Sequence, residues 1–262
     1  MSDVEGRPAS TMSTERRFGI AISVALILGG VYWALTGLTE GTKTGEGSYA
    51  VQGDALRIDN GSAEVEVRAG DGTDVKVERQ FERNVFGSDP KEKYDNGKLE
   101  LTDSGCGFLS FGCKTTYIVT VPKDLRVTLR SSSGDVKVFG LTGDVDLKSS
   151  SGSIEVHDVD GSLRMESSSG DLEAQDLRAT TVSTESSSGD VDLDFAVAPQ
   201  SVDSKASSGD VSIRIPSGDE SYKVETDTSS GDESANVKID QTATRTITAK
   251  TSSGDVTIEY NH

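Results

Sequence analysis

RSSSGDVKV, residues 130–138, is a stretch that recurs in modified form until the chain ends. The shared element is Ser-Ser-Gly followed by Asp or Ser, and its glycine recurs at Gly134, Gly152, Gly170, Gly189, Gly209, Gly231 and Gly254. Successive glycines lie 18, 18, 19, 20, 22 and 23 residues apart. Only the copy at Gly231, where Asp232 and Glu233 follow, lacks an apolar residue after this element. A short, slowly drifting period is typical of a repeat protein, in which each repeat packs on its neighbours.

The pattern of apolar residues indicates two short β-strands in each repeat. Gly143 follows Gly134 by nine residues and Gly161 follows Gly152 by nine, so the first repeats have a half-period. Apolar and polar residues alternate between these glycines, as in Val136-Lys-Val138. Alternation with period two indicates half-buried strands. Glycine suits the turns because it reaches positive φ without a Cβ clash, and Ser or Asp can bond the local backbone.

The sequence predicts an all-β fold, and a parallel β-solenoid of short repeats is the architecture we expect. A repeat of about 18 residues cannot bury its own apolar face, so it must stack on its neighbours. An antiparallel β-sandwich, in which each half-repeat is one strand of a meander, is the alternative that the spacing leaves open. The repeat core spans 127–262 of a domain that covers 49–262. Its repeats lengthen after Arg178, which indicates bulges or wider loops.

Residues 18–38 predict a transmembrane helix, because these 21 residues carry no charge and can cross the hydrocarbon core. Residues 1–17 then form a cytoplasmic tail and 39–48 a linker. Arg16 and Arg17 precede the span, so the positive-inside rule places the N-terminus in the cytoplasm. We therefore expect a single-pass protein of the cell membrane with an extracellular C-terminal domain. A cleaved signal peptide is the alternative, since it has the same basic start and apolar middle.

Further strands are expected before the repeat core, where apolar residues alternate at 56–58, 63–67, 75–77, 99–101 and 117–121. The dipeptide Asn60-Gly61 predicts a β-hairpin, because both residues readily adopt the positive φ of a tight turn. The run 81–97 is charged and irregular, which predicts an excursion on the surface.

The two cysteines, Cys106 and Cys113, are separated by six residues and lie between two expected strands. A domain outside the membrane favours a disulfide between them. A metal site is the alternative, but two thiols without a nearby histidine fall short of four ligands. The loop between the cysteines carries Phe108, Leu109 and Phe111, which either pack onto the core or form a contact loop for a partner.

The segment 121–138, VPKDLRVTLRSSSGDVKV, and the midpoint GLTGD at 140–144 resemble a known family. It is the bacterial putative-adhesin family, a domain of unknown function with β-strand repeats and Ser-Gly-Asp turns. The resemblance extends from about Tyr49 to the C-terminus. It implies a surface-exposed, repeat-built β domain that is often tethered to a membrane, and it implies no reaction.

The charge of the chain narrows the classes of partner. The net charge is −18, and it lies entirely beyond the N-terminal tail, whose three acids balance three bases. Nucleic acid is excluded as a partner because phosphate contacts need clusters of Lys and Arg. We expect a protein or cell-envelope partner, with side-by-side self-association as a further option at exposed sheet edges.

Aspartates at equivalent turn positions are the one feature that points to a cofactor. If the repeats stack, their carboxylates form a ladder with a spacing of about 5 Å, and calcium could bridge such a ladder. The pattern differs from the Gly-Gly-x-Gly-x-Asp calcium repeat, so ordinary turn formation without any cofactor is the reading we favour. The residues are Asp135, Asp171, Asp190, Asp210, Asp232 and Asp255, with Ser153 in the second copy.

The sequence gives no catalytic signature, so we expect a protein that is not an enzyme. His157 and His262 lie in unrelated contexts, and neither has a nucleophile and an acid at a recognisable spacing. The function that we expect is non-catalytic adhesion, envelope structure or interaction by a membrane-anchored, extracytoplasmic β-repeat domain. The alternative is a calcium-dependent binding module that uses the stacked turn aspartates.

Overall fold

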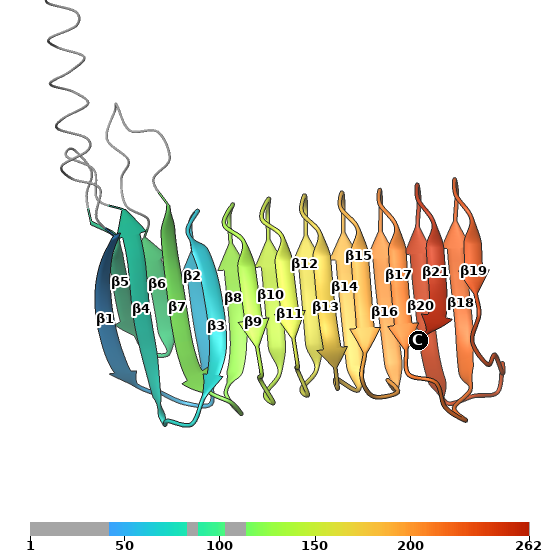
Figure 1. Cartoon of the computed structure of the whole chain (residues 1–262), viewed down its shortest axis with the longest axis horizontal. Coiled ribbons are helices and arrows are strands. Elements are labelled where there is room, and N and C mark those ends of the chain that lie inside the picture. The colour runs from blue at the N-terminus through green and yellow to red at the C-terminus, as the bar shows by residue number, and fades with distance from the viewer. Residues whose placement is uncertain (1–41, 83–88, 103–113, 262) are drawn as a thin grey trace, which may run out of the picture.

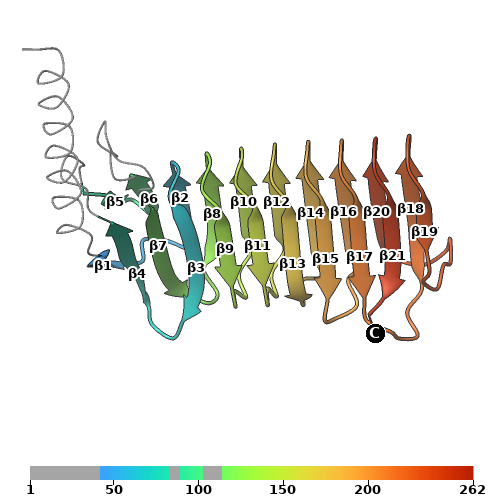
Figure 2. The same cartoon turned by 45° about the horizontal axis from the view of Figure 1, so that its top comes forward.

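The computed structural model describes residues 42–82, 89–102 and 114–261, and these residues form β-strands and turns without a helix (Figure 1). The strands build two sheets that face each other along a rod (Figure 2). Sheet A has the order β1 (Thr42–Ala50), β4 (Asp74–Glu82), β7 (Thr115–Pro122), β3 (Glu64–Gly70), β9 (Val136–Phe139), β11 (Ile154–His157), β13 (Leu172–Leu177), β15 (Val191–Phe195), β17 (Val211–Ile215), β21 (Val256–Tyr260) and β19 (Glu233–Ala235). Sheet B has the order β5 (Lys91–Asp95), β6 (Lys98–Thr102), β2 (Ala55–Asn60), β8 (Arg126–Ser131), β10 (Val145–Ser149), β12 (Leu163–Ser167), β14 (Thr181–Ser186), β16 (Ser201–Ala206), β20 (Arg245–Thr251) and β18 (Tyr222–Thr228).

Each repeat forms one rung of the rod, with one strand in sheet B, a turn, and one strand in sheet A. Neighbouring rungs pair in parallel, as β10 does with β12 and β11 with β13. The predicted all-β fold and parallel solenoid are therefore confirmed, and an antiparallel sandwich is wrong for the repeats. Eleven strands at about 4.8 Å per strand make sheet A about 48 Å long.

The core lies between the sheets and is filled by the alternating apolar residues. Equivalent residues stack along the rod, as Leu129, Leu147 and Met165 do in sheet B, and all three are fully buried. Where most sheet B strands enter their turns, the inward residue carries a hydroxyl or amide, and several of these side chains bond the turn backbone. Ser131 Oγ, for example, donates to the carbonyl of Gly134 at 2.9 Å. The repeated serine thus satisfies backbone groups that the turn would otherwise bury unpaired.

The repeated glycine is required mainly because adjacent rungs approach so closely. A Cβ added to Gly152 would lie 2.3 Å from the carbonyl oxygen of Gly134, and one on Gly134 would lie 1.7 Å from that of Ala63. From Gly170 onward, positive φ is a second reason for glycine at this position. At Gly170 itself φ is +152°. Freedom in φ is therefore only part of the reason why glycine recurs at this turn position.

The N-terminal part departs from the parallel pattern. β1 and β4 pair antiparallel, β4 pairs antiparallel with β7, and β5 pairs antiparallel with β6. The tight hairpin is at Asn96-Gly97, where φ is +49° and +73°, and not at Asn60-Gly61 as predicted. Asn60 instead ends a sheet B strand, and its Nδ2 donates to the carbonyl of Ala63 at 2.7 Å and to Ser131 Oγ at 2.9 Å. The predicted surface excursion over 81–97 is also wrong in part, because β5 is an edge strand of sheet B.

At the other end, the order of the rungs differs from the order of the repeats. β17 pairs with β21, and β19 is the outer neighbour of β21 (Figure 1). The last repeat in the sequence is therefore the second-to-last rung, and the repeat before it is outermost. This excursion explains the spacings of 22 and 23 residues around Gly231, because the chain passes over one rung and then returns. The lengthening near Arg178 coincides with a register shift between Ala174 and Leu177 in β13.

The described residues contain no helix that could span a membrane. The predicted span 18–38, the tail 1–17 and the start of the linker fall outside the described residues, and the transmembrane helix stays a prediction. The end of the predicted linker, 42–48, is part of β1, so the folded domain starts earlier than residue 49.

Candidate functional site: the ladder of turn aspartates

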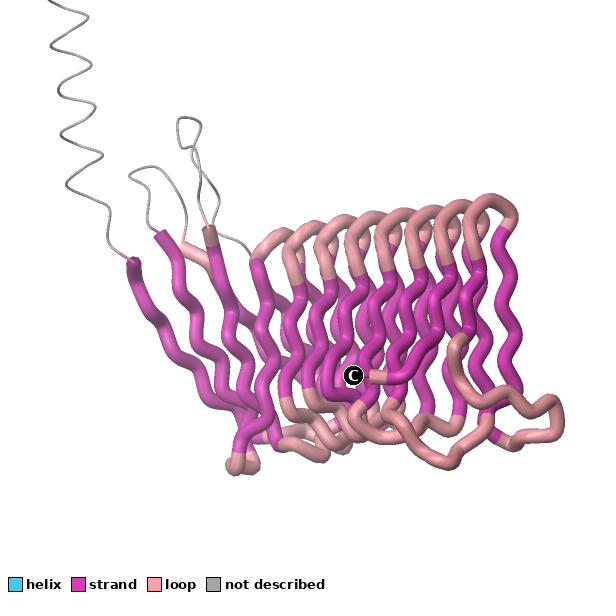
Figure 3. The backbone as a smooth tube through the Cα atoms, turned by 45° about the vertical axis from the view of Figure 1, so that its right-hand side comes forward, coloured by secondary structure: helices cyan, strands magenta, loops and turns pink. Residues whose placement is uncertain are grey.

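The six turn aspartates lie on one long rim of the rod, each at the point where a turn leads into a sheet A strand. All six are exposed. The turns stack along this rim, which is seen as a row of arches in Figure 3. In space the order along the rim is Asp135, Ser153, Asp171, Asp190, Asp210, Asp255 and Asp232, because the last two rungs are exchanged.

Five of these carboxylates, all except that of Asp232 on the outermost rung, accept a hydrogen bond from the backbone of the next rung at the same turn position. Asp190 N–H donates to Asp171 Oδ1 at 3.0 Å, and Asp210 N–H donates to Asp190 Oδ1 at 2.9 Å. The same bond continues past the exchanged rungs: Asp255 N–H donates to Asp210 Oδ1 and Asp232 N–H to Asp255 Oδ1, both at 2.8 Å. Because a carboxylate only accepts hydrogen bonds, an aspartate here satisfies a turn N–H that sheet pairing leaves free.

The first copy starts the ladder and the half-period repeats its chemistry. Ser153 N–H donates to Asp135 Oδ1 at 3.1 Å, although residue 153 is itself a serine. On the opposite rim, Ser162 N–H donates to Asp144 Oδ1 at 3.1 Å. Asp144 of the midpoint Gly-Asp therefore accepts a backbone N–H of the next rung on one rim, as the Ser-Gly-Asp aspartates do on the other. Only the Ser-Gly-Asp set is predicted as a ladder from the sequence.

The bonds hold like charges close together. Two carboxylates about 5 Å apart repel by about 0.8 kcal/mol in water, and salt screens part of this. A charge-assisted hydrogen bond is of similar or larger size, so each rung can gain from its aspartate in spite of the repulsion. Rung stacking is therefore a sufficient physical reason for an aspartate at these turns. In the described ranges, no group of three or more His, Cys, Asp or Glu side chains is placed to hold a metal ion.

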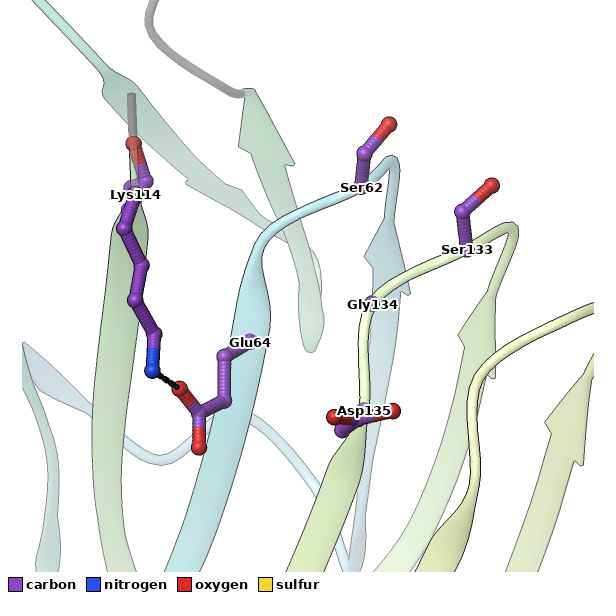
Figure 4. A pocket seen from close by; sticks show the side chains of 7 residues that line it. Ser62, Glu64, Lys114, Ser133, Gly134 and Asp135 are labelled. Carbon is purple, nitrogen blue, oxygen red and sulfur yellow. Dashed lines mark ion pairs between the residues drawn. The ribbon is translucent and has the colours of Figure 1, made fainter. Parts of the chain in front are cut away.

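A polar recess of about 230 Å³ lies at the N-terminal end of this rim (Figure 4). It opens where the stacked turns stop and β7 enters. Lys114 Nζ lies 2.8 Å from Glu64 Oε2, and this carboxylate raises the pKa of the Lys114 ammonium. Lys114 is largely exposed, so the ion pair is weak. The lining residues are Ser62, Glu64, Lys114, Thr115, Ser133, Gly134 and Asp135.

The recess is lined by one ammonium group, of Lys114, and two carboxylates, and each of these groups already has a partner. Glu64 pairs with Lys114, and Asp135 accepts the N–H of Ser153. Such a set can bind a small polar molecule by hydrogen bonds. This site could not be predicted from the sequence, because Lys114 and Glu64 are 50 positions apart and lie at the starts of different strands.

The other predicted site residues fall outside the described ranges. They are Cys106, Cys113, Phe108, Leu109 and Phe111, all in 103–113. The disulfide and the contact loop stay predictions. His157 lies on the outer face of β11, where Nε2 is 2.8 Å from Glu155 Oε1. Lys137 and then His157 lower the pKa of the Glu155 carboxyl.

The comparison with known families agrees with this architecture. The sequence pattern of the Toastrack DUF4097 family matches residues 54–194 and 141–259, which together cover the rod from β2 to β21. The chain belongs to the Toastrack DUF4097 family. This membership confirms the adhesin-like β-repeat family that the sequence resembles. No curated protein matches the chain.

Two solved structures are similar to this chain at low sequence identity. A putative adhesin from Bacteroides fragilis is 17% identical, with a TM-score of 0.56, over 84% of this chain and 97% of that chain. A putative adhesin from Parabacteroides distasonis is 15% identical, with a TM-score of 0.43, over 84% of this chain and 97% of that chain. At 17% identity, the similarity to the Bacteroides fragilis structure supports the fold alone.

Proposed function

We propose that this Toastrack chain is a membrane-anchored, extracytoplasmic rod of a bacterial envelope, with a non-catalytic role in adhesion, envelope structure or interaction. Its family membership supports an adhesin-like role. The similar structure from Bacteroides fragilis is described as a putative adhesin, which is consistent with this role. The partner that we propose is a protein or another envelope component.

The observation that carries the proposal is the continuity of the rod's outer faces. On both sheets, outward side chains of neighbouring rungs form ion pairs. Lys148 Nζ lies 2.6 Å from Glu166 Oε2 on sheet B, and Arg214 Nε lies 3.3 Å from Asp194 Oδ2 on sheet A. Large apolar residues are rarely exposed in the described ranges, where Val197 and Ile239 are the two examples. Such faces stay soluble and present a long surface, which suits a spacer or a binding scaffold.

Protease treatment of intact cells tests the anchoring and the orientation. The full chain is expressed with an epitope tag before residue 1 and a second tag after residue 262. We expect a protease added to intact cells to remove the C-terminal tag and spare the N-terminal tag. Digestion of both tags only after lysis would contradict the extracytoplasmic placement.

Attachment of cells tests the interaction role. Cells that display the chain, and cells that do not, are incubated on surfaces coated with bacterial envelope fragments. We expect display to increase the number of attached cells at least several-fold. Equal attachment would argue against adhesion.

The predicted contact loop can be tested in the same assay. The triple change Phe108→Ser, Leu109→Ser and Phe111→Ser should reduce attachment if the loop forms the contact. Val197→Ser is a matched control, because it removes an exposed apolar residue from a different loop. An equal loss with both variants would show that the contact loop has no special role.

A further inference from the structure

The outermost rung is contributed by an excursion of the chain, and we call the segment 216–244 the capping unit. It leaves the rod after β17, forms β18 and β19, and returns to start β20. β18 pairs with β20 over seven residues, and β19 pairs with β21 over three. The last repeat of the sequence is therefore covered by the capping unit.

The surface beneath the capping unit would be adhesive if it were exposed. Ile247 and Ala249 of β20, and Val256 and Ile258 of β21, are fully buried. They lie in register with core residues of the preceding rung, such as Val202 and Val211. An uncovered rung of this kind combines an apolar core edge with unpaired backbone groups, which is the arrangement that promotes pairing between sheet edges.

The capping unit itself carries a charge where every other repeat carries an apolar core residue. Glu233 is in register with Val256, and the equivalent positions hold Val136, Ile154, Leu172, Val191 and Val211. Its carboxylate is exposed and accepts hydrogen bonds from Thr226 Oγ1 at 2.5 Å and from Thr228 N–H at 3.2 Å. Glu233 thus bridges the two strands of the outermost rung and closes the end of the core with a polar group.

The free edge of β18 is protected by two further features. The segment after β19 folds back over the edge, where Tyr222 N–H donates to Lys238 O at 3.0 Å and Asp240 N–H donates to Tyr222 O at 2.9 Å. The rest of the strand carries Lys223, Glu225 and Asp227. Charged residues and covering loops are the devices by which soluble proteins prevent edge pairing.

From these observations, we propose that the capping unit prevents a second copy of this chain from docking end to end on the rod, and that Glu233 is the residue on which this exclusion depends. If this exclusion were lost, two copies would pair their C-terminal ends about a twofold axis perpendicular to the sheets. Sheet A would meet sheet A of the second copy, and sheet B would meet sheet B, with antiparallel strands. This contact closes on itself, so its product is a dimer and not a fibre.

Two variants test the proposal on the full chain in detergent, with mass measured by light scattering over a range of concentrations. The first is Glu233→Val with Thr226→Val, which makes the end of the core apolar. We expect its protein mass to double with rising concentration while the wild type stays at the monomer mass. Glu233→Gln is the matched control, because it keeps a polar side chain of the same size, and it should remain monomeric.

The second variant removes the capping unit. Residues 216–245 are replaced by AVAPQ, the linker 196–200, because this linker joins the preceding rungs and Ser201 is in register with Thr246. We expect this variant to dimerise at lower concentration than the first. Circular dichroism identifies folded protein in each sample. The proposal is overturned if both variants are folded and monomeric, or if the wild type forms the same dimer.

Discussion

The middle of the rod and its two ends place different residues at the same structural positions. In the middle, the inward position that follows each turn is apolar, and the turn glycines and aspartates contact the neighbouring rung. At the C-terminal end, Glu233 occupies the core position, and Asp232 has no further rung to accept from. At the N-terminal end, Arg79 forms an ion pair with Glu92, whose side chain is 7% exposed. Tyr49 and Tyr94 contact each other there at a centroid distance of 5.1 Å.

This difference shows that the repeat and its endings obey separate requirements. A residue in the middle is constrained by rungs on both sides, so both its size and its backbone position are fixed. A residue at an end has one neighbouring rung and must also make the end soluble, as terminal repeats of solenoids generally do. Gly45 lies at the N-terminal end, where a Cβ would be 2.4 Å from Nε of Arg79, the partner of Glu92.

The largest effect is expected from a side chain added to a turn glycine in the middle. Gly152→Val should lower the free energy of unfolding by about 4 kcal/mol, because the new Cβ would lie 2.3 Å from a backbone oxygen that cannot move without its rung. Gly72→Val is the control, since the nearest atom to a Cβ there is 3.9 Å away. Urea denaturation should give a change of less than about 1 kcal/mol for the control. Equal losses for the two variants would remove the distinction between the middle and the end.

Truncation of core residues should give the next largest effect. Leu147→Ala is expected to cost about 3 kcal/mol, because Leu147 is fully buried between two rungs. Val224→Ala in the outermost rung should cost about 1 kcal/mol, because Val224 is only half-buried. The ratio of the two losses, measured by urea denaturation, reports how sharply packing decreases at the end. A larger loss for Val224→Ala would contradict our description of the end.

The turn aspartates should differ in the same way. Asp190→Ala leaves the N–H of Asp210 without its acceptor and should cost about 1 kcal/mol. Asp190→Asn keeps an oxygen acceptor and removes a like charge, so its stability should stay within about 0.5 kcal/mol of the wild type. Asp232→Ala, on the last rung, should have no measurable effect. Thermal melting of the three variants is sufficient, and a loss with Asp232→Ala equal to that of Asp190→Ala would refute the hydrogen-bonded ladder.

The smallest effect concerns ion pairs on the outer face. Lys148, followed by Arg164, holds the pKa of the Glu166 carboxyl below its usual 4.5. A lowered pKa contributes stability above pH 4.5, and this stability is lost as the pH falls through the folded-state pKa. Lys148→Gln should therefore cost about 0.2 to 1 kcal/mol at pH 7, and the difference from wild type should shrink below pH 4.5. Lys250→Gln, whose partner Glu225 is 60% exposed, should cost less. A difference between wild type and Lys148→Gln that grows in acid would exclude this assignment.

Local pattern was sufficient to predict the repeating part of the fold. The alternation at Val136-Lys-Val138 and the recurring Ser-Ser-Gly-Asp depend on contacts between equivalent residues, so each repeat carries the same information. The sequence left open which of two architectures the spacing served, because both use short alternating strands. Parallel pairing depends on how two rungs contact each other, so the sequence of a single repeat does not determine it.

The endings could not be predicted in the same way. Asn60-Gly61 and Asn96-Gly97 are the same dipeptide, but only the second joins antiparallel neighbours, because the strands around Asn60 belong to different sheets. In the sequence, the repeat at Gly231 differs from the others because Glu233 stands where they have an apolar residue. The role of Glu233 as a cap became visible only when the structure placed the repeat at Gly231 outside the final one.

The most direct test of the central claim, that the turn aspartates serve rung stacking and not metal binding, is the thermal melting of the full chain after chelator treatment, with and without millimolar calcium. We predict the same melting temperature in both conditions, apart from the general effect of ionic strength. The same concentration of magnesium is the control for that effect. A rise of several degrees that is specific to calcium, and that disappears when the six turn aspartates become asparagine, would contradict this claim and make the ladder a calcium site.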